Sequence, residues 1–577
     1  MPSPQQHPAD RRSCRSPFPI NEPFEPYRYE PLPSPRSIRL VILRPALTFQ
    51  HPLRCSLRVV SLDEPPTYEA LSYVWGSPQG TRPIRCNGRE ILVTPNCEDA
   101  LRNLRIAHRP RALWIDAICI DQESMAEKSV QVPLMGDIYR LAKQAIVWLG
   151  PSVDGLSGTL MRLNLIGKIH FEMSTDPLSE RKKRRANKIL PRGEVDRICR
   201  ICSNEWFQRI WTFQEFMLSS HVVFMLGRAQ CRPRGLYTMY HYGRELMDHD
   251  TAQAFELKSY LLRYFHDEEF SAISSLLDLA ILNRATDPRD KAYGFAAFLQ
   301  QKISRVPPFD VDYSKSVAEV YTDFSWRFMC AVQSAGILSL VPTGQEAGGW
   351  PSWVPDLRDP ALIKRDRCDW IDCSCERRLT GDEQKREFKT ISFSEPATLS
   401  IGAKHCAIID LIGPTMPRPE GRHNHDGVYT ENSQSCPGLS SWISFVDSLD
   451  EKSAALSGLR FLLQLTPGLT RWDIVPEGRA VPEREKEGWG RWHKYQTSLD
   501  GCTIFSTATG QIGVCKGEVI PGDHIFLLAT ANHPFVLRRV GESFRVVGSI
   551  SILGLGVHGW KSVRFTDSDG VKKINIV

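Results

Sequence analysis

Short apolar runs separated by polar or glycine-containing turns mark the first half of the chain. Three of these runs have the length and composition of buried strands: residues 68–76 (YEALSYVWG), 112–120 (ALWIDAICI) and 145–150 (AIVWLG). Before the last of them, residues 134–142 (LMGDIYRLA) repeat apolar positions at helical spacing. Strands that alternate with helices in this way predict a parallel α/β sheet.

Changes in composition along the chain indicate five segments. We expect a disordered, proline-rich arm at 1–36, an α/β domain at 37–235, a helical extension at 236–360, an irregular charged region with short helices at 361–500, and a C-terminal module at 501–577. In the last segment, short apolar strands alternate with turns such as PGD and NHP, which predicts a small antiparallel β module.

Composition narrows the class of protein. With 42% hydrophobic and 24% charged residues, the chain is typical of soluble globular proteins. A net charge of +6 over 577 residues does not indicate a dedicated nucleic-acid binder. We find neither the apolar core of a signal peptide at the start nor an apolar run of about 18 residues elsewhere. We therefore expect a cytoplasmic protein with no membrane partner, and we expect its 16 cysteines to be reduced.

Cysteines and histidines invite comparison with zinc sites, which hold the metal with four ligands. Cys199 and Cys202 have the C-x-x-C spacing but lack a second pair of matching spacing. A second cluster consists of Cys368, Cys373, Cys375, His405 and Cys406. We interpret the first pair as unligated thiols on a helix and the second cluster as part of a surface loop, and we predict no metal site.

Three further features have ordinary explanations. Residues 554–559 (GLGVHG) match the letters of a dinucleotide-binding loop, but a strand and turn are expected after them, so we interpret them as a glycine-rich turn. Residues 181–185 (RKKRR) are interpreted as an exposed charged segment, with a nuclear signal as the alternative. Cys119 would need a histidine base to act as a nucleophile, and its apolar surroundings favour a small buried residue instead.

Glu215 is the one carboxylate in an apolar and aromatic segment, residues 209–220 (RIWTFQEFMLSS). A buried carboxylate is costly unless it is paired or functional. Two interpretations stay open: a structural carboxylate paired with an arginine, and a catalytic group. Arg209 lies six residues before Glu215 in the sequence, outside the spacing that makes neighbours on a helix.

Four longer segments bear a resemblance to a known family: residues 68–76, 113–122 (LWIDAICIDQ), 131–150 (QVPLMGDIYRLAKQAIVWLG) and 206–215 (WFQRIWTFQE). In order and spacing they resemble the fungal heterokaryon incompatibility (HET) domain, with the close match over residues 68–216. Two departures stand out. Pro133 falls where the family usually continues a helix, which a proline tolerates only near the helix start. Asp121 stands where the family often has Asn.

Weaker matches continue along the chain. Residues 285–295 (ATDPRDKAYGF), 311–321 (VDYSKSVAEVY) and 350–357 (WPSWVPDL) resemble segments that commonly follow the domain. The residues GD at 522–523 and FVLRRV at 535–540 are similar to the C-terminal tail of long family members. The resemblance implies a role in fungal nonself recognition, as an effector of growth arrest and cell death. It also implies self-association and an incompatibility-locus protein as partner.

The HET domain is in turn similar to the Toll/interleukin-1 receptor (TIR) domain. Ser72 and Tyr73 resemble the Ser-Tyr pair that typically ends the first TIR strand. Trp211 and Glu215 reproduce the TIR spacing of a tryptophan and a glutamate, although Thr212 replaces the usual cysteine. This resemblance implies a TIR-like, flavodoxin-like parallel sheet with added helices.

In TIR domains that cleave NAD⁺ the corresponding glutamate is catalytic, so the resemblance implies that Glu215 is the catalytic residue and NAD⁺ a substrate, with no cofactor. A carboxylate beside the ribose can stabilise the positive charge that develops as nicotinamide leaves. Residues expected to line the substrate site are Tyr73, Trp75, Gly76, Asp116, Asp121, Gln122 and Trp211. The alternative is a non-enzymatic scaffold that triggers cell death by self-association.

Overall fold

The computed structural model describes residues 25–76, 80–172, 189, 194–235, 277, 280–302, 306, 309–341, 350–359, 381–394, 397–416, 441–442, 444–446, 448–449, 501–531, 533–553 and 570–577. The chain forms two compact units, Met1–Ile201 with Ser219–Met239 and Cys202–Leu218 with Tyr240–Val577. The segment Cys202–Leu218, which includes Glu215, therefore belongs to the second unit. The segment boundaries expected from the sequence stay predictions.

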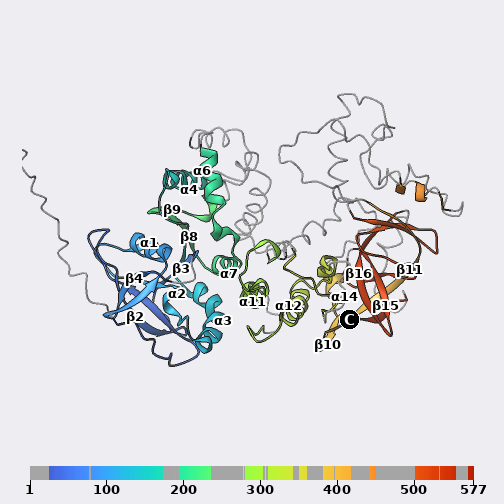
Figure 1. Ribbon diagram of the computed structural model, residues 1–577, viewed down its shortest axis with the longest axis horizontal. Coiled ribbons are helices and arrows are strands. Elements are labelled where there is room, and N and C mark those ends of the chain that lie inside the picture. Colours follow the sequence, from blue (N-terminus) through green and yellow to red (C-terminus); the bar gives the residue numbers. More distant parts are fainter. Residues whose placement is uncertain are drawn as a thin grey trace, which may run out of the picture. The chain divides into compact units, whose positions relative to one another are not determined.

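A nine-stranded mixed sheet forms the centre of the first unit (Figure 1). Its strands are β1 (Ser37–Leu43), β2 (Arg54–Ser61), β3 (Glu69–Tyr73), β4 (Arg82–Cys86), β5 (Arg89–Val93), β6 (Arg111–Trp114), β7 (Gln144–Trp148), β8 (Val222–Leu226) and β9 (Ala229–Cys231). Their order in the sheet is β5-β4-β2-β1-β6-β3-β7-β8-β9. Strand β3 runs parallel to both of its neighbours, β6 and β7, and β7 runs parallel to β8.

The four parallel strands lie in the order β6-β3-β7-β8, so the first of them along the chain lies between the second and the third. This is the strand order of flavodoxin-like doubly wound sheets. The expected α/β class with a parallel sheet is confirmed in this region. The finer likeness to TIR domains stays a prediction.

The helices of the first unit are α1 (Pro95–Leu104), α2 (Asp116–Cys119), α3 (Met125–Leu141), α4 (Leu156–Glu172) and α6 (Val195–Cys202). The sequence predicted that the apolar run at 112–120 forms one strand, and this prediction is wrong. Strand β6 ends at Trp114, and α2 begins at Asp116. The Asp116 carboxylate accepts a hydrogen bond from the backbone N–H of Ala117 at 2.7 Å, an interaction that turns the chain into a helix.

Pro133 lies inside α3 and not near its start, so a proline is tolerated here within a helix. The helix begins at Met125, where the Ser124 side chain accepts a hydrogen bond from the N–H of Glu127 at 3.2 Å. Proline removes the N–H that would otherwise bind the carbonyl of Ser129. Both residues are exposed, so water can satisfy that carbonyl and the helix continues past Pro133.

Residues 25–36, which fall within the expected proline-rich arm, form hydrogen bonds with the rest of the first unit. The Tyr29 hydroxyl donates a hydrogen bond to the carbonyl of Ile118 at 3.0 Å. The backbone N–H of Tyr27 donates to the carbonyl of Glu90 at 2.8 Å. Residues 1–24 lie outside the described residues.

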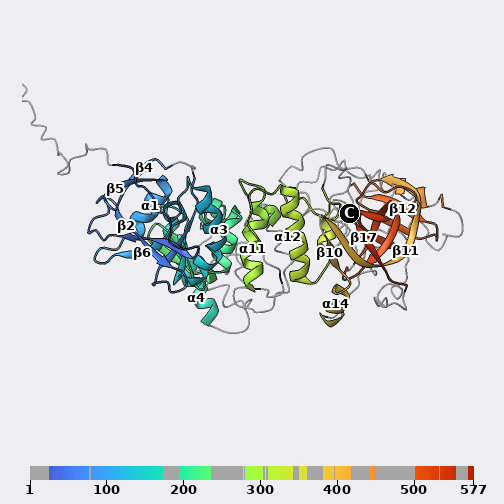
Figure 2. The ribbon, with the colours of Figure 1, turned by 90° about the horizontal axis from the view of Figure 1, so that it is seen from below.

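Short and long helices make up the first part of the second unit. They are η2 (Glu205–Gln208), α7 (Trp211–Met217), α11 (Asp290–Lys302), α12 (Val317–Val332), η4 (Gly336–Leu340) and α14 (Gly381–Phe388). Helix α7 packs on α11 through Phe213, whose ring centroid lies 4.2 Å from that of Phe295. A Cβ at Gly294 would lie 2.8 Å from the Ile210 side chain, so a glycine allows this close approach. Helices α11 and α12 lie side by side (Figure 2).

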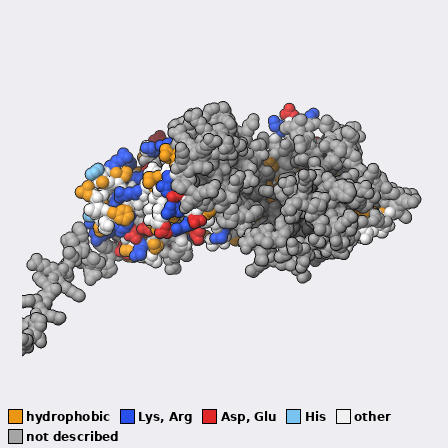
Figure 3. Space-filling view, turned by 90° about the horizontal axis from the view of Figure 1, so that it is seen from above, with side chains coloured by type: hydrophobic (Ala, Val, Ile, Leu, Met, Phe, Trp, Pro, Cys, Tyr) orange, Lys and Arg blue, Asp and Glu red, His pale blue; other side chains and the backbone are white. Residues whose placement is uncertain are grey.

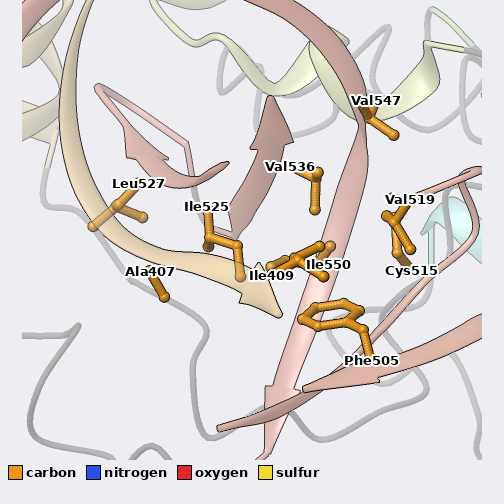
Figure 4. Close-up of a cluster of buried hydrophobic side chains, with 10 residues drawn as sticks. All are labelled: Ala407, Ile409, Phe505, Cys515, Val519, Ile525, Leu527, Val536, Val547 and Ile550. Atoms are coloured by element: carbon orange, nitrogen blue, oxygen red, sulfur yellow. The ribbon is translucent and has the colours of Figure 1, made fainter. Parts of the chain in front are cut away.

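A second sheet follows, with strands β10 (Ser392–Ser394), β11 (Thr398–Thr415), β12 (Thr503–Thr507), β13 (Ile512–Cys515), β14 (His524–Leu528), β15 (Pro534–Val540), β16 (Ser543–Leu553) and β17 (Lys572–Ile576). The 18-residue strand β11 pairs with β14 along one part and with β12 along another, so the sheet closes on itself. Ten apolar side chains fill its interior, including Ile409, Phe505 and Ile550 (Figure 4). The predicted C-terminal antiparallel module is present.

This sheet takes β10 and β11 from residues 392–415, which the sequence analysis placed in an irregular region. The period-2 pattern of β11 is broken by a bulge between His405 and Ala407, where the pairing with β14 shifts register. A bulge moves the apolar residues out of strict alternation, which hides a strand from periodicity.

Asp523, the acidic residue of the GD motif, forms an ion pair with Arg538 on β15. It is 1% exposed, and its oxygens accept hydrogen bonds from the Arg538 guanidinium at 2.9 and 3.0 Å. One oxygen also accepts from the N–H of Ile520 at 2.9 Å.

Asp523→Asn should lower the free energy of unfolding by about 2 kcal/mol, because a charged hydrogen bond is lost. Denaturant titration measures this, with the exposed Asp410→Asn as control; equal stabilities would contradict the role.

Candidate functional site

The parallel strands of the first unit end at one edge of the sheet. Strands β3, β6 and β7 end at Tyr73, Trp114 and Trp148, respectively. In open α/β sheets, ligands bind outside the carboxyl ends of the strands where the strand order reverses, which here lies between β3 and β7. Several of the residues singled out in the sequence follow these strand ends.

Trp75, Asp116 and Gln122 form a hydrogen-bonded group at this edge. The Trp75 indole Nε1 donates to Oδ2 of Asp116 at 2.8 Å. The Gln122 side-chain amide donates to the backbone carbonyl of Asp116 at 2.9 Å. All three are partly exposed, so a ligand could reach their polar atoms. The structure thus brings Trp75 to Asp116, which lies 41 residues further along the chain.

Asn96, which the sequence analysis missed, links the two strands that flank the reversal. Its Nδ2 donates to the carbonyl of Val74, just past β3, at 2.6 Å, and its Oδ1 accepts from the indole Nε1 of Trp148, the last residue of β7, at 2.9 Å. Asn96 is the second residue of α1, which Thr94 caps. The stretch Thr-Pro-Asn is a typical helix start, and this signal could have placed Asn96 at a strand-end loop.

Tyr73, Gly76 and Asp121, the other residues of the first unit that were expected to bind substrate, each have a role in the fold. Tyr73 is 2% exposed and lies in the core. Gly76 has a φ of +75°, a conformation that favours glycine. Asp121 accepts a hydrogen bond from the N–H of Glu123 at 3.0 Å, a turn that Asn would form equally well, which accounts for the departure at this position. Its own N–H donates to Glu127 at 2.8 Å.

Trp211 and Glu215 lie on α7, in the second unit. Glu215 is 4% exposed and interacts with other groups in the structure.

Asp290, on α11, is a partly buried carboxylate in this unit. Burial raises its pKa even though hydrogen bonds from Tyr313 and Trp211 oppose the shift. The Tyr313 hydroxyl lies 2.7 Å from Oδ1 of Asp290. Asp290 is thus a partner of Trp211 that the sequence analysis did not identify, although it lies within the motif at 285–295.

Cys119 does not have the environment of a nucleophile. It is fully buried, and burial raises the pKa of its thiol to about 12. A thiol of this kind carries almost no thiolate at neutral pH. The interpretation of Cys119 as a small buried residue is confirmed.

The remaining motifs fall partly outside the described residues. Cys199 and Cys202 lie on α6, as expected. The motifs at 554–559 and 181–185, together with Cys368, Cys373 and Cys375, lie outside the described residues. Within the described part of the chain, no group of three or more His, Cys, Asp or Glu residues could hold a metal ion. None of the described helices has both the length and the apolar character needed to cross a bilayer.

The surface of the first unit carries charges of both signs. On the face shown in Figure 3, Lys and Arg side chains lie among Asp, Glu, hydrophobic and uncharged polar side chains. A mixture of this kind is typical of an ordinary solvated surface.

Comparison with known proteins identifies a family for one part of the chain. Residues 68–215 match the model of the family described as heterokaryon incompatibility protein (HET). A curated relative from Neurospora crassa, heterokaryon incompatibility protein 6, OR allele, is 34% identical over 224 residues. This match covers 33% of the present chain, and the chain spans about a third (33%) of the relative's length. No solved structure matches the chain. Residues 68–215 are therefore identified as a HET domain of the kind found in fungal heterokaryon incompatibility proteins.

Proposed function

We propose that this protein acts in fungal heterokaryon incompatibility, as an effector of the growth arrest and cell death that follow fusion of incompatible hyphae. The HET-domain match and the name of the Neurospora relative support the first part of this proposal. That relative matches along 33% of its own length, so the proposed chemistry rests on the residues of this chain.

The proposed activity is hydrolysis of NAD⁺ at the nicotinamide–ribose bond. The observation that carries it is the polar group at the strand edge, where Trp75 and Asp116 lie beside the reversal of strand order. NAD⁺ offers aromatic rings that can stack on an indole and ribose hydroxyls that can donate to a carboxylate. The Asp116 oxygens accept hydrogen bonds from Trp75 and Ala117, which fix the orientation of the carboxylate at this edge.

The spacing of Trp211 and Glu215 supports a separate proposal, that Glu215 supplies the carboxylate that the cleavage needs. Nicotinamide leaves from a cationic state, so no strong acid is required, and the ribose becomes oxocarbenium-like. A carboxylate in an apolar environment stabilises this developing charge more strongly than one in water. Phe213, Phe216 and Met217, which are buried on the same short helix, provide apolar surroundings.

Access to Glu215 requires an opening, because the side chain is 4% exposed. We propose that self-association provides it, which makes assembly the activating step. If so, the rate of NAD⁺ cleavage per molecule rises with protein concentration. Incubating the purified protein with NAD⁺ over a range of concentrations and following nicotinamide release tests both statements. Assembled, folded protein without turnover would contradict the proposed activity.

Trp75→Phe should weaken binding of NAD⁺ about fivefold, because it keeps an aromatic ring but removes the donor that orients Asp116. Equilibrium dialysis with labelled NAD⁺ measures the dissociation constant. Trp326→Phe is the matched control, since Trp326 stacks on Phe388 and Phe393 in the second unit. An unchanged dissociation constant for Trp75→Phe would remove the strand edge from the proposed site.

A non-enzymatic scaffold is the second candidate, and the burial of Glu215 is the observation that favours it. A buried carboxylate with interaction partners is also what a purely structural role requires. In that case the protein would trigger cell death by self-association alone, and no residue would touch a substrate.

A further inference from the structure

Two histidines meet on the outer face of the C-terminal sheet. His405 on β11 and His524 on β14 lie on adjacent strands, and Nε2 of His405 is 3.1 Å from Nδ1 of His524. Alternation along β14 puts Ile525 and Leu527 in the closed interior, so His524 points away from it. The bulge between His405 and Ala407 shifts the register and brings the first histidine beside the second.

The pair is supported by aromatic side chains and stays open to solvent. The ring centroid of Phe526 lies 5.1 Å from that of His405, and the centroid of Phe544 lies 5.8 Å from that of His524. His405 is exposed and His524 is partly exposed. The phenyl rings of Phe526 and Phe544 contact the imidazoles without covering them. The two nitrogen atoms are therefore held close together at an accessible surface.

We propose that His405 and His524 form a binding site for a divalent transition-metal ion of the kind that prefers imidazole, such as Cu²⁺, Ni²⁺ or Zn²⁺. Metal–nitrogen bonds of about 2.0–2.1 Å place two neighbouring ligand atoms about 2.9–3.4 Å apart in octahedral or tetrahedral geometry. The observed separation of 3.1 Å falls in this range. Water completes the coordination, since no third ligand of suitable type occurs nearby among the described residues.

The hydrogen bond between the two rings has to change when a metal ion binds. In the structure, one facing nitrogen donates its N–H and the other accepts it. Metal binding requires the donor ring to move its proton to its other nitrogen, so that both facing nitrogens present lone pairs.

Cys406 does not belong to the site, although the sequence places it next to His405. Its Sγ lies 3.1 Å from the carbonyl of Lys404, and burial raises the pKa of its thiol to about 12. The partner of His405 is His524, which is 119 residues further along the chain. Only the pairing of β11 with β14 reveals it.

The test uses the full chain and substoichiometric Cu²⁺, read by electron paramagnetic resonance and by calorimetric titration. We expect hyperfine splitting from two nitrogen ligands in the wild type. His405→Ala and His524→Ala should each weaken the tightest binding about tenfold or more, because chelation by two linked ligands is lost. His108→Ala, at an exposed position in the first unit, should bind like the wild type.

Two results would overturn the proposal. Equal affinity of the wild type and both single variants would mean that Cu²⁺ binds elsewhere. A signal from one nitrogen in the wild type would mean that the pair only shares a hydrogen bond. Circular dichroism of each variant checks that the sheet is intact, which is expected because both side chains lie on its outer face.

Discussion

Glu215→Gln is expected to leave a folded protein that releases nicotinamide from NAD⁺ at least about a hundredfold more slowly than the wild type, the loss typical when a group that stabilises developing charge is removed. The amide has nearly the same shape as the carboxylate but carries no negative charge. It can therefore replace Glu215 in the tightly packed α7, where the side chain is 4% exposed. The initial rate of nicotinamide release, measured at equal concentrations of assembled protein, gives the result.

Glu205→Gln is the matched control for this substitution. Glu205 lies in η2, in the same segment of the second unit, but is exposed. Its removal should leave the rate unchanged. If Glu215→Gln turns over NAD⁺ like the wild type and Glu205→Gln, then Glu215 is not the catalytic carboxylate, and its burial reflects a structural role.

Expression of Glu215→Gln in a fungal host separates the enzyme from the scaffold. Loss of toxicity together with loss of turnover would support hydrolysis as the cause of cell death. Cell death that persists without turnover would favour the scaffold, because assembly alone would then suffice.

Arg39→Met should lower the free energy of unfolding of the first unit by about 3–5 kcal/mol, the usual cost of removing one partner of a buried ion pair. Arg39 is 2% exposed, and its guanidinium donates to both oxygens of Glu127, at 2.5 and 3.0 Å. It also donates to the carbonyls of Cys119 at 3.0 Å and Glu30 at 2.6 Å. The substitution leaves these acceptors without their donor and a carboxylate without its counter-charge.

Controls separate the charge from the fork-shaped hydrogen bonding of Arg39. Arg39→Lys keeps the charge but not the fork, so its loss of stability should be intermediate. Arg200→Met breaks an ion pair with Asp154 in which the two side chains are 50% and 70% exposed. It should lower the free energy of unfolding by less than about 1 kcal/mol. Denaturant unfolding followed by tryptophan fluorescence measures all three. A loss for Arg39→Met no larger than that for Arg200→Met would contradict the prediction.

The cost of Arg39→Met should depend on pH. Burial would raise the pKa of Glu127, but the hydrogen bond and charge of Arg39 outweigh it and lower the pKa below the ordinary value of 4.5. A carboxylate with a lowered pKa stabilises the folded state above its unfolded pKa, and this contribution is lost as the pH falls through the folded pKa. The stability difference between wild type and Arg39→Met should therefore be largest near neutral pH and shrink as the pH falls below about 4.5.

Local patterns sufficed where neighbouring residues determine the structure. The strands that contain Glu69–Tyr73 and Gln144–Trp148, and the helix that leads to Leu141, follow from apolar residues at the period of each element. The HET family was recognisable for a related reason, since its motifs are continuous segments in a constant order. At residues 112–120 the apolar run led to a strand prediction that was wrong, because the chain turns into the short helix α2 at Asp116.

By itself, then, the sequence determined the α/β class, the HET domain and the residues at its strand ends. Only the tertiary structure decided which of them meet. The hydrogen bonds of Asn96 to two different strand ends, the pairing of His405 with His524 and the inclusion of β11 in the C-terminal sheet join segments far apart in the chain. The grouping of Glu215 with the second unit was also invisible to periodicity. Periodicity reports which side of an element is buried, whereas these features depend on which elements are packed together.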